Sequence, residues 1–306
     1  MESVDKTRRV LNADSSERLH LDNIPKHVLH MLFNCEIYHH LEMPKIAVMI
    51  NQGKWKKLVK FVGRDYVTIF AARHGYIDLI RLIDNPCWYD VVAKAAKHGQ
   101  LDMLKCIYNE NMCHSGLPYS GAKYAARGGH IDMLEWLTNV CKISLDNRLC
   151  YEAAKRGHIH VLRWLYDHGC ESDERICAYA AEGGHLDVMV WLRLNGHQWN
   201  TDTCDQAAKY GHLHVLKWIV SQGCPWDEWT TMLAAKYGHL DILKWAIENG
   251  CPCDASACSF AAEGGQLEIL KWLVEAGYPL RIEEAGNHAS SNGHSEVVEW
   301  IRAAKN

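Results

Sequence analysis

The stretch Ala207-Ala208-Lys209-Tyr210-Gly211-His212-Leu213 returns letter for letter 27 residues later, from Ala234 to Leu240. Its core is a pair of small residues with a glycine four positions after the first of them. Copies of this core begin at Ala71, Ala95, Ala125, Ala153, Ala180, Ala207, Ala234, Ala261 and Ala289. A fixed period of this length is typical of stacked supersecondary units. The sequence therefore predicts a repeat array.

One repeat, from Asp227 to Gly250, is expected to contain two short helices. Asp227 is a favourable N-cap for the first helix, and Gly238 favours its termination in the left-handed conformation. The second helix is mostly apolar, and its Trp245 lies seven residues after Gly238. The same spacing gives Trp136, Trp164, Trp191, Trp218, Trp245, Trp272 and Trp300. Because a buried Trp removes a large apolar area from water, we expect this Trp column to be the main stacking contact.

The predicted fold is an all-α solenoid of about nine short helical pairs, over residues 66–306. The last repeat is polar, with Ser290, Ser291 and Asn292 beside its glycine, and is expected to be a C-terminal cap. Residues 1–19 are polar without periodicity, which predicts a disordered tail. Residues 20–62 form a separate helical segment by their apolar spacing.

The composition limits the functional classes. The net charge of −4 gives no basic face for nucleic acid, and the longest early apolar run, Ile46 to Ile50, is too short to span a membrane. With no secretory signal, the 13 cysteines are expected to be reduced thiols in a cytoplasmic setting.

The segments Ala207 to Ile219 and Ala261 to Leu273 carry the pattern Ala-Ala-x-x-Gly-His/Gln-Leu-x-Val/Ile-Leu-x-Trp-Leu/Ile, which resembles the core of the ankyrin repeat. The period is shorter than the usual ~33 residues of that family. The resemblance therefore implies that the β-hairpin finger between repeats is absent or reduced to a tight turn. This Trp-rich and Cys-rich variant looks like the ankyrin proteins of large DNA viruses of protists, which would place it in the host cytoplasm or nucleus.

The N-terminal segment resembles an F-box. Its pattern is Ile-Pro-x-x-Val-Leu-x-x-Leu-Phe from Ile24, followed by Lys-Trp-Lys-Lys-Leu from Lys54. The resemblance implies docking on a Skp-type adaptor and, through it, a cullin. The residues that would dock are Ile24, Pro25, Val28, Leu29, Leu32 and Trp55. The alternative is a helical cap that shields the first repeat, which a solenoid needs at each end.

The many His and Cys residues follow the repeat phase, and the chain is not expected to be an enzyme or to hold a metal or cofactor. Cys150, Cys177 and Cys204 occupy one position in successive repeats, where helices ~8–10 Å apart keep thiols too distant to share an ion. The His after each glycine is expected to cap the second helix. The alternative is a metal- or thiol-dependent enzyme. Its site would have to include His39-His40 or Cys251 and Cys253.

In ankyrin-type stacks the two residues after the paired alanines point into the concave face. Carried over to this sequence, that rule predicts a protein-binding patch from Lys209-Tyr210 and Lys236-Tyr237, with Arg156 in the same row. Trp229 is added because other repeats hold Arg, Asp or Ser at its position. The alternative is a solvated face whose tyrosines merely cover the alanine helices.

The predicted function is therefore a protein–protein interaction module. If the F-box resemblance holds, it is the substrate-recognition adaptor of an SCF-type (Skp–cullin–F-box) ubiquitin ligase, with the repeats binding the target. The alternative is a plain ankyrin scaffold or inhibitor without a ligase.

Overall fold

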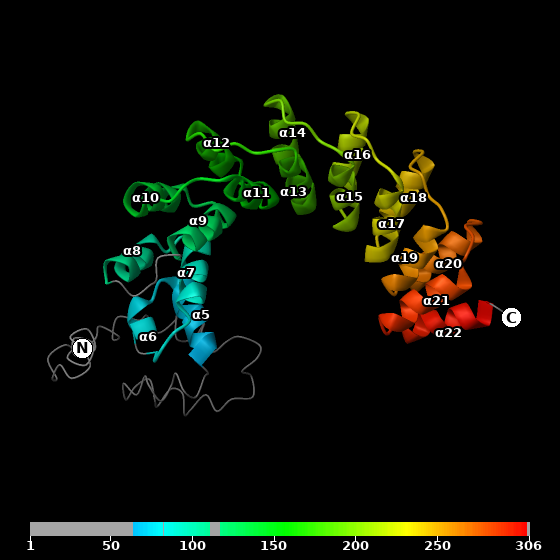
Figure 1. Ribbon diagram of the computed structural model, residues 1–306, viewed down its shortest axis with the longest axis horizontal. Coiled ribbons are helices and arrows are strands. Elements are labelled where there is room, and N and C mark those ends of the chain that lie inside the picture. Colours follow the sequence, from blue (N-terminus) through cyan, green and yellow to red (C-terminus); the bar gives the residue numbers. More distant parts are fainter. Residues whose placement is uncertain (1–63, 82, 111–116, 305–306) are drawn as a thin grey trace. The chain divides into compact units, whose positions relative to one another are not determined.

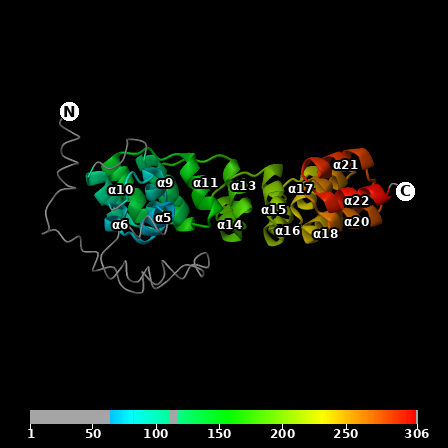
Figure 2. The same ribbon diagram turned by 90° about the horizontal axis from the view of Figure 1, so that it is seen from below.

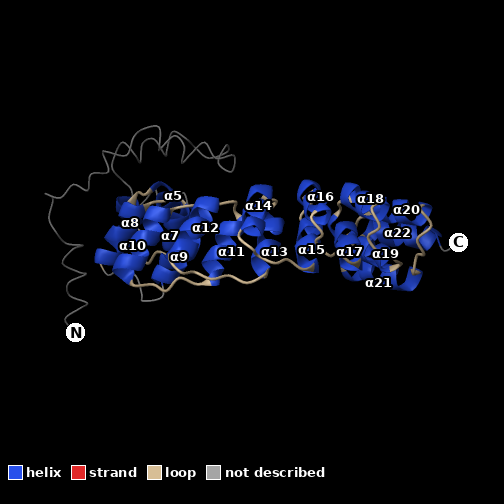
Figure 3. Cartoon of the chain, turned by 90° about the horizontal axis from the view of Figure 1, so that it is seen from above, coloured by secondary structure: helices blue, strands red, loops and turns tan. Residues whose placement is uncertain are grey.

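The computed structural model describes residues 64–81, 83–110 and 117–304. These residues form helices and contain no strand, which confirms the all-α prediction for this part of the chain (Figure 3). The predicted tail, 1–19, and the predicted N-terminal segment, 20–62, lie outside the described residues.

The chain divides into two compact units, residues 1–124 and 125–306. In the first unit, the described helices are α5 (Arg64–His74), α6 (Ile77–Arg81), α7 (Trp88–Lys97) and α8 (Leu101–Asn109). Helix α9 (Leu117–Gly128) contains the boundary between the units. The second unit continues with α10 (Ile131–Cys141), α11 (Asn147–Lys155), α12 (Ile159–Asp167), α13 (Arg175–Gly183), α14 (Leu186–Leu194), α15 (Thr201–Lys209), α16 (Leu213–Ser221), α17 (Glu228–Tyr237), α18 (Leu240–Glu248), α19 (Ser256–Glu263), α20 (Leu267–Glu275), α21 (Ile282–Ser291) and α22 (Ser295–Ala304).

The helices follow the predicted two-helix repeat, with an odd-numbered first helix and an even-numbered second helix. Successive first helices of the second unit, from α11 to α21, pack against one another. Within this unit, α11, α13, α15 and α17 lie on the inner side of its curve, and α12, α14, α16 and α18 lie on the outer side (Figure 1). The view in Figure 2 shows the same pairs following one another in chain order.

The paired alanines form the contact between first helices. Ala207 and Ala208 on α15 have no exposed surface, and the same holds for Ala234 and Ala235 on α17. Their single methyl groups allow the neighbouring helix to come close. The backbones come closest at two glycines, because a Cβ added to Gly183 or to Gly264 would overlap a carbonyl oxygen of the preceding repeat.

The second helices are held by aliphatic side chains, and the expectation for the Trp column is wrong in this respect. On α16, Val215, Leu216 and Ile219 are fully buried, whereas Trp218 is only half-buried. The Trp218 ring meets Trp199 edge-on, with the ring centroids 6.0 Å apart. The indoles therefore cover the outer side of the core, and the aliphatic residues beneath them make the closed packing.

The predicted turn residues perform their expected roles. The Asp227 carboxylate accepts a hydrogen bond from the Trp229 backbone amide at 3.0 Å, which caps α17. Gly238 ends that helix in the left-handed region, with φ 88° and ψ 17°, where a residue with a Cβ is strained. Asp173 makes the corresponding bond to the amide of Arg175 at 3.1 Å.

The connection between successive repeats is a short loop that contains a hydrogen bond from a thiol. A longer ankyrin repeat has its β-hairpin finger at this place. The Cys251 thiol donates to the Asp227 carbonyl, with 3.2 Å between sulfur and oxygen. Cys170 does the same to the Asp146 carbonyl at 3.2 Å. Each bond returns the chain to the start of its own first helix, so that a short turn suffices. The described connections contain no strand, in agreement with the predicted loss of the finger.

Within the described residues, no helix combines the length and the apolar character needed to cross a membrane.

Candidate functional site

Six residues at the ends and faces of α15, α17 and α19 form two groups of aromatic rings and ammonium groups, which meet at the adjacent residues Lys236 and Tyr237 of α17. Four of the predicted site residues, Lys209, Tyr210, Lys236 and Tyr237, are joined there by the predicted Trp229 and by Phe260, which was not predicted. We call these six residues the aromatic–lysine surface: Lys209, Tyr210, Trp229, Lys236, Tyr237 and Phe260.

Lys209 lies between two tyrosine rings. Its Nζ is 5.1 Å from the centroid of Tyr210 and 5.4 Å from that of Tyr237, within the range at which a cation and a ring face attract each other. Both tyrosines are exposed, at 43% and 44%. Because Lys209 and Tyr237 come from successive repeats, this cradle spans the contact between α15 and α17.

The lysines two repeats before and one repeat after Lys209 are neutralised by carboxylates. Lys155 pairs with Glu182, and Lys236 pairs with Glu263 at 2.6 Å. For Lys209, the corresponding position in the next repeat is Lys236 instead of Glu. Among the residues that the structure describes, Lys209 has no carboxylate within salt-bridge distance. Of the three lysines at this repeat position, Lys209 is therefore the one whose positive charge is not offset by a carboxylate of the described residues.

Tyr210 is held in place by the neighbouring ion pair. A hydrogen bond with Glu182, together with burial and the negative charge of that carboxylate, raises the pKa of Tyr210 to about 12. The phenol is therefore neutral near pH 7 and donates to Glu182. This bond fixes the ring, and it leaves the ring face available to Lys209.

Among the described residues, Trp229 is the most exposed tryptophan, at 49%. It meets Phe260 of the next repeat edge-on, with ring centroids 5.7 Å apart. The Nζ of Lys236 is 5.6 Å from the same Phe260 ring. Phe260 thus joins the tryptophan to the lysine row.

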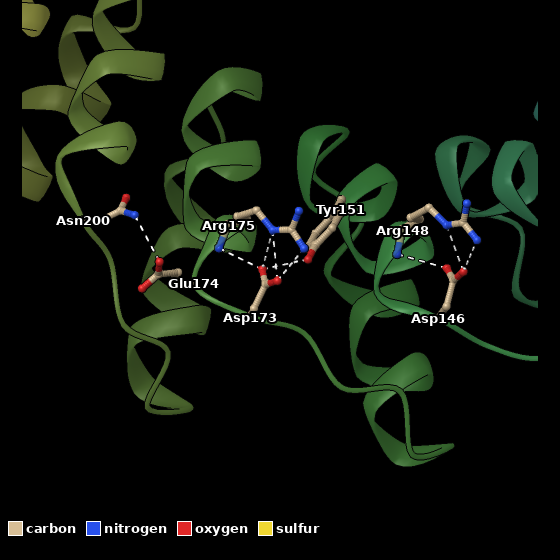
Figure 4. A network of polar contacts seen from close by, with 7 residues as sticks. All are labelled: Asp146, Arg148, Tyr151, Asp173, Glu174, Arg175 and Asn200. Atoms are coloured by element: carbon tan, nitrogen blue, oxygen red, sulfur yellow. Dashed lines mark hydrogen bonds and ion pairs between the residues drawn. The ribbon is translucent and has the colours of Figure 1, made fainter.

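Other repeats show what the Trp229 position does when it holds arginine (Figure 4). Arg148 folds back onto its own N-cap, with its Nη2 2.7 Å from Asp146, and Arg175 does the same with Asp173 at 2.6 Å. Hydrogen bonds from Arg175 lower the pKa of Asp173 to about 2. These arginines are used inside the array, and Arg175 also lies over the Tyr151 ring of the preceding repeat, 5.3 Å from its centroid. Trp229 has no such bond to make, and its ring remains exposed instead.

The remaining predicted residues do not join this group. Arg156 is exposed at the C-cap of α11, and the structure gives it no ring contact or ion pair with the six residues. The predicted adaptor-docking residues lie outside the described residues: Ile24, Pro25, Val28, Leu29, Leu32 and Trp55.

The histidines after the turn glycines do not cap the second helix with their side chains, which corrects the prediction. His212 occupies the N-cap of α16 without a capping bond, and its Nε2 instead bonds to the Glu182 carbonyl of the preceding repeat at 3.1 Å. His239 bonds to the Lys209 carbonyl at 3.0 Å. Because the free carbonyls at the end of a helix need partners, each of these histidines links its repeat to the previous one.

Seven thiols of the second unit are buried and belong to the packing, whereas Cys141 and Cys253 are partly exposed. Burial raises the pKa of Cys177 and of Cys251 to about 12, which keeps both thiols protonated and weakly nucleophilic near neutral pH. The sulfurs of Cys150 and Cys170 lie 3.0 Å apart within one repeat. The sequence did not predict this contact because the two residues occupy different repeat positions. The described residues contain no group of three or more His, Cys, Asp and Glu arranged to hold a metal ion.

Comparison with known proteins confirms the repeat type. The family model of ankyrin repeats (3 copies) matches residues 204–284 and 231–306. The second unit therefore contains ankyrin repeats, a class of module that binds other proteins. The solved structures that are similar include the crystal structure of the human ASB11 ankyrin repeat domain, at 20% identity and a TM-score of 0.42 over 52% of this chain and 85% of that one. No curated protein matches. The F-box and viral resemblances stay predictions.

The histidine link predicts a pH dependence of stability. Burial lowers the pKa of His158 and of His212 below the ordinary value of 6.5. The unfolded chain then binds the proton more readily than the folded chain, so these residues stabilise the fold above pH 6.5 and destabilise it progressively as the pH falls. Gln266 takes this position in another repeat. We therefore expect His212→Gln to fold and to lose less stability than the wild type between about pH 7.5 and about pH 5.5.

Urea unfolding of both proteins at the two pH values measures this difference. Asp205, whose pKa is raised to about 6 by burial, changes stability in the opposite direction but is common to both proteins. Equal pH dependence in the two proteins would show that His212 does not titrate as described.

Proposed function

We propose that the second unit is a scaffold that binds a protein partner on the aromatic–lysine surface. The observation that carries this proposal is Trp229, which is 49% exposed at a position where the repeat does not require tryptophan. Tyr210 and Tyr237 add two further exposed rings on the neighbouring helix ends. Tryptophan and tyrosine are among the residues that most often dominate binding energy at protein interfaces.

Two of the six side chains are also held in place by bonds within the array, which supports the same proposal. Tyr210 is held by Glu182, Lys236 by Glu263, and the helices beneath them by the buried alanines. A partner therefore does not have to order these side chains. Preorganisation of this kind raises affinity because less conformational entropy is lost on binding.

The binding role is favoured over chemistry at Cys177 or Cys251 because these two thiols are in the wrong state for catalysis. A nucleophilic cysteine needs a lowered pKa and access to substrate, whereas Cys177 and Cys251 are buried with raised pKa values. The protein is proposed to bring partners together without changing covalent bonds.

We further propose that residues 20–62 dock on a Skp-type adaptor, which would make the protein the target-recognition subunit of an SCF-type ubiquitin ligase. This proposal rests on the sequence pattern that starts at Ile24 and Pro25 and ends at Trp55. A plain scaffold or inhibitor, whose N-terminal segment is only a cap, is the alternative.

Substitution of Trp229 tests the binding surface. The full chain would be panned against a phage library of random dodecapeptides, and the enriched peptides would be synthesised and measured by fluorescence polarisation. We expect Trp229→Ala to weaken their binding at least tenfold, since hot-spot tryptophans commonly contribute ~2 kcal/mol or more. The matched control is Trp199→Ala, which removes an indole that packs on Trp218. Enriched peptides that bind the Trp229 variant as tightly as the wild type, or a library without specific binders, would refute the proposed surface.

Docking on the adaptor is tested separately with a purified Skp-type adaptor and cullin. We expect the full chain to bind them, and the double variant Val28→Glu/Leu29→Glu to lose that binding while it keeps its peptide affinity. A full chain that does not bind the adaptor would show that residues 20–62 are only a cap, without affecting the proposal for the repeats.

A further inference from the structure

The aromatic–lysine surface contains one ammonium group, that of Lys209, for which the repeats supply no glutamate among the described residues. Lys155 and Lys236 each meet a glutamate one repeat later, at Glu182 and Glu263. Lys209 meets two tyrosine rings instead. Its half-buried side chain is therefore held between these rings, where the ammonium can form a charge-assisted bond with a carboxylate.

We propose, on the basis of the function proposed above, that the partner presents an acidic peptide segment whose carboxylate binds Lys209 as Glu182 binds Lys155 and Glu263 binds Lys236. The repeats themselves show the chemistry, because Lys155 and Lys236, which occupy this position two repeats before and one repeat after Lys209, each pair with a glutamate of the following repeat. The walls of the cradle, Tyr210 and Tyr237, would pack against the methylene groups of the incoming acidic side chain.

The position of Trp229 sets the second requirement for the partner. Trp229 and Tyr237 are eight residues apart on one helix, α17, so that about 12 Å of helix separates them at 1.5 Å per residue. An extended peptide covers that distance with about four residues. The partner segment therefore carries an aromatic or large aliphatic residue about four positions from its Asp or Glu, and this residue packs on Trp229 and Phe260.

The charges around the cradle favour a peptide carboxylate over the phosphates of a nucleic acid. Glu182 is hydrogen-bonded to Tyr210, and Glu263 forms an ion pair with Lys236. A nucleic acid carries a phosphate at every nucleotide, so its phosphates would be repelled by these two carboxylates. Of Lys155, Lys209 and Lys236, only Lys209 has no carboxylate partner among the described residues. A single carboxylate flanked by apolar side chains matches that distribution.

The test uses the full chain and the dodecapeptides selected on it. Lys209→Met keeps the length and the apolar stem of the side chain but removes its charge. The matched control is Lys217→Met, because Lys217 is exposed on α16 with its Nζ 5.8 Å from the Trp245 ring. Unfolding curves of both variants establish that they are folded.

We expect the enriched peptides to share an Asp or Glu about four residues from an aromatic or large aliphatic residue. Lys209→Met weakens their binding roughly tenfold or more, as does replacing the shared acid by its amide, because a charge-assisted bond is lost. Lys217→Met has no effect. Lys209→Glu restores binding to peptides in which the acid is replaced by lysine.

Three results overturn the inference. Peptides that depend on Trp229 but bind Lys209→Met as well as the wild type refute the acidic partner and leave the proposed function standing. Peptides indifferent to both residues refute the proposed function as well. Tighter binding of a poly-dT oligonucleotide than of any selected peptide, lost in Lys209→Met, would assign the cradle to nucleic acid.

Discussion

The close approach of successive first helices is the constraint on which the second unit depends. It requires side chains no larger than alanine at two adjacent positions of each helix, and Ala207, Ala208, Ala234 and Ala235 are fully buried there. Helices of about ten residues are too short to be stable alone in water, so that the contact between repeats must supply their stability. At Gly183 and Gly264 the approach is tighter still, since even one methyl group would overlap the preceding backbone.

This constraint also determines where function can reside. The alanines, the aliphatic residues of the second helices and the turn glycines are fixed by packing. Residues at the ends and outer faces of the first helices are not, and they vary from repeat to repeat. Where arginine takes the first-turn position, as at Arg175, the side chain pairs with Asp173 and lies over Tyr151 of the preceding repeat. Where tryptophan takes that place, at Trp229, the ring remains available to a partner.

Features that depend on contacts within one repeat could be predicted from the sequence. The Asp227 cap, the left-handed Gly238 and the paired helices all rest on interactions between residues close in the chain. The errors concern contacts between repeats or between layers. His212 has the spacing of a cap, but its partner is a carbonyl 30 residues earlier, and the local pattern carries no information about that distance. Phe260 was missed because it becomes part of the candidate site only through Trp229 and Lys236 of the preceding repeat.

The most direct test of the close-packing account is the same substitution made at two glycines of α-helical conformation, followed by equilibrium urea unfolding. Gly264 ends α19 at φ −83°, so that alanine is tolerated there by the backbone and any loss of stability reports the contact with Lys236. Gly286 lies in α21, where the nearest atom to an added Cβ is 4.0 Å away. We expect Gly264→Ala to destabilise the protein by about 1–3 kcal/mol and Gly286→Ala to stabilise it by about 0.5–1 kcal/mol. A gain in stability at both positions would contradict the claim that the repeats meet backbone to backbone.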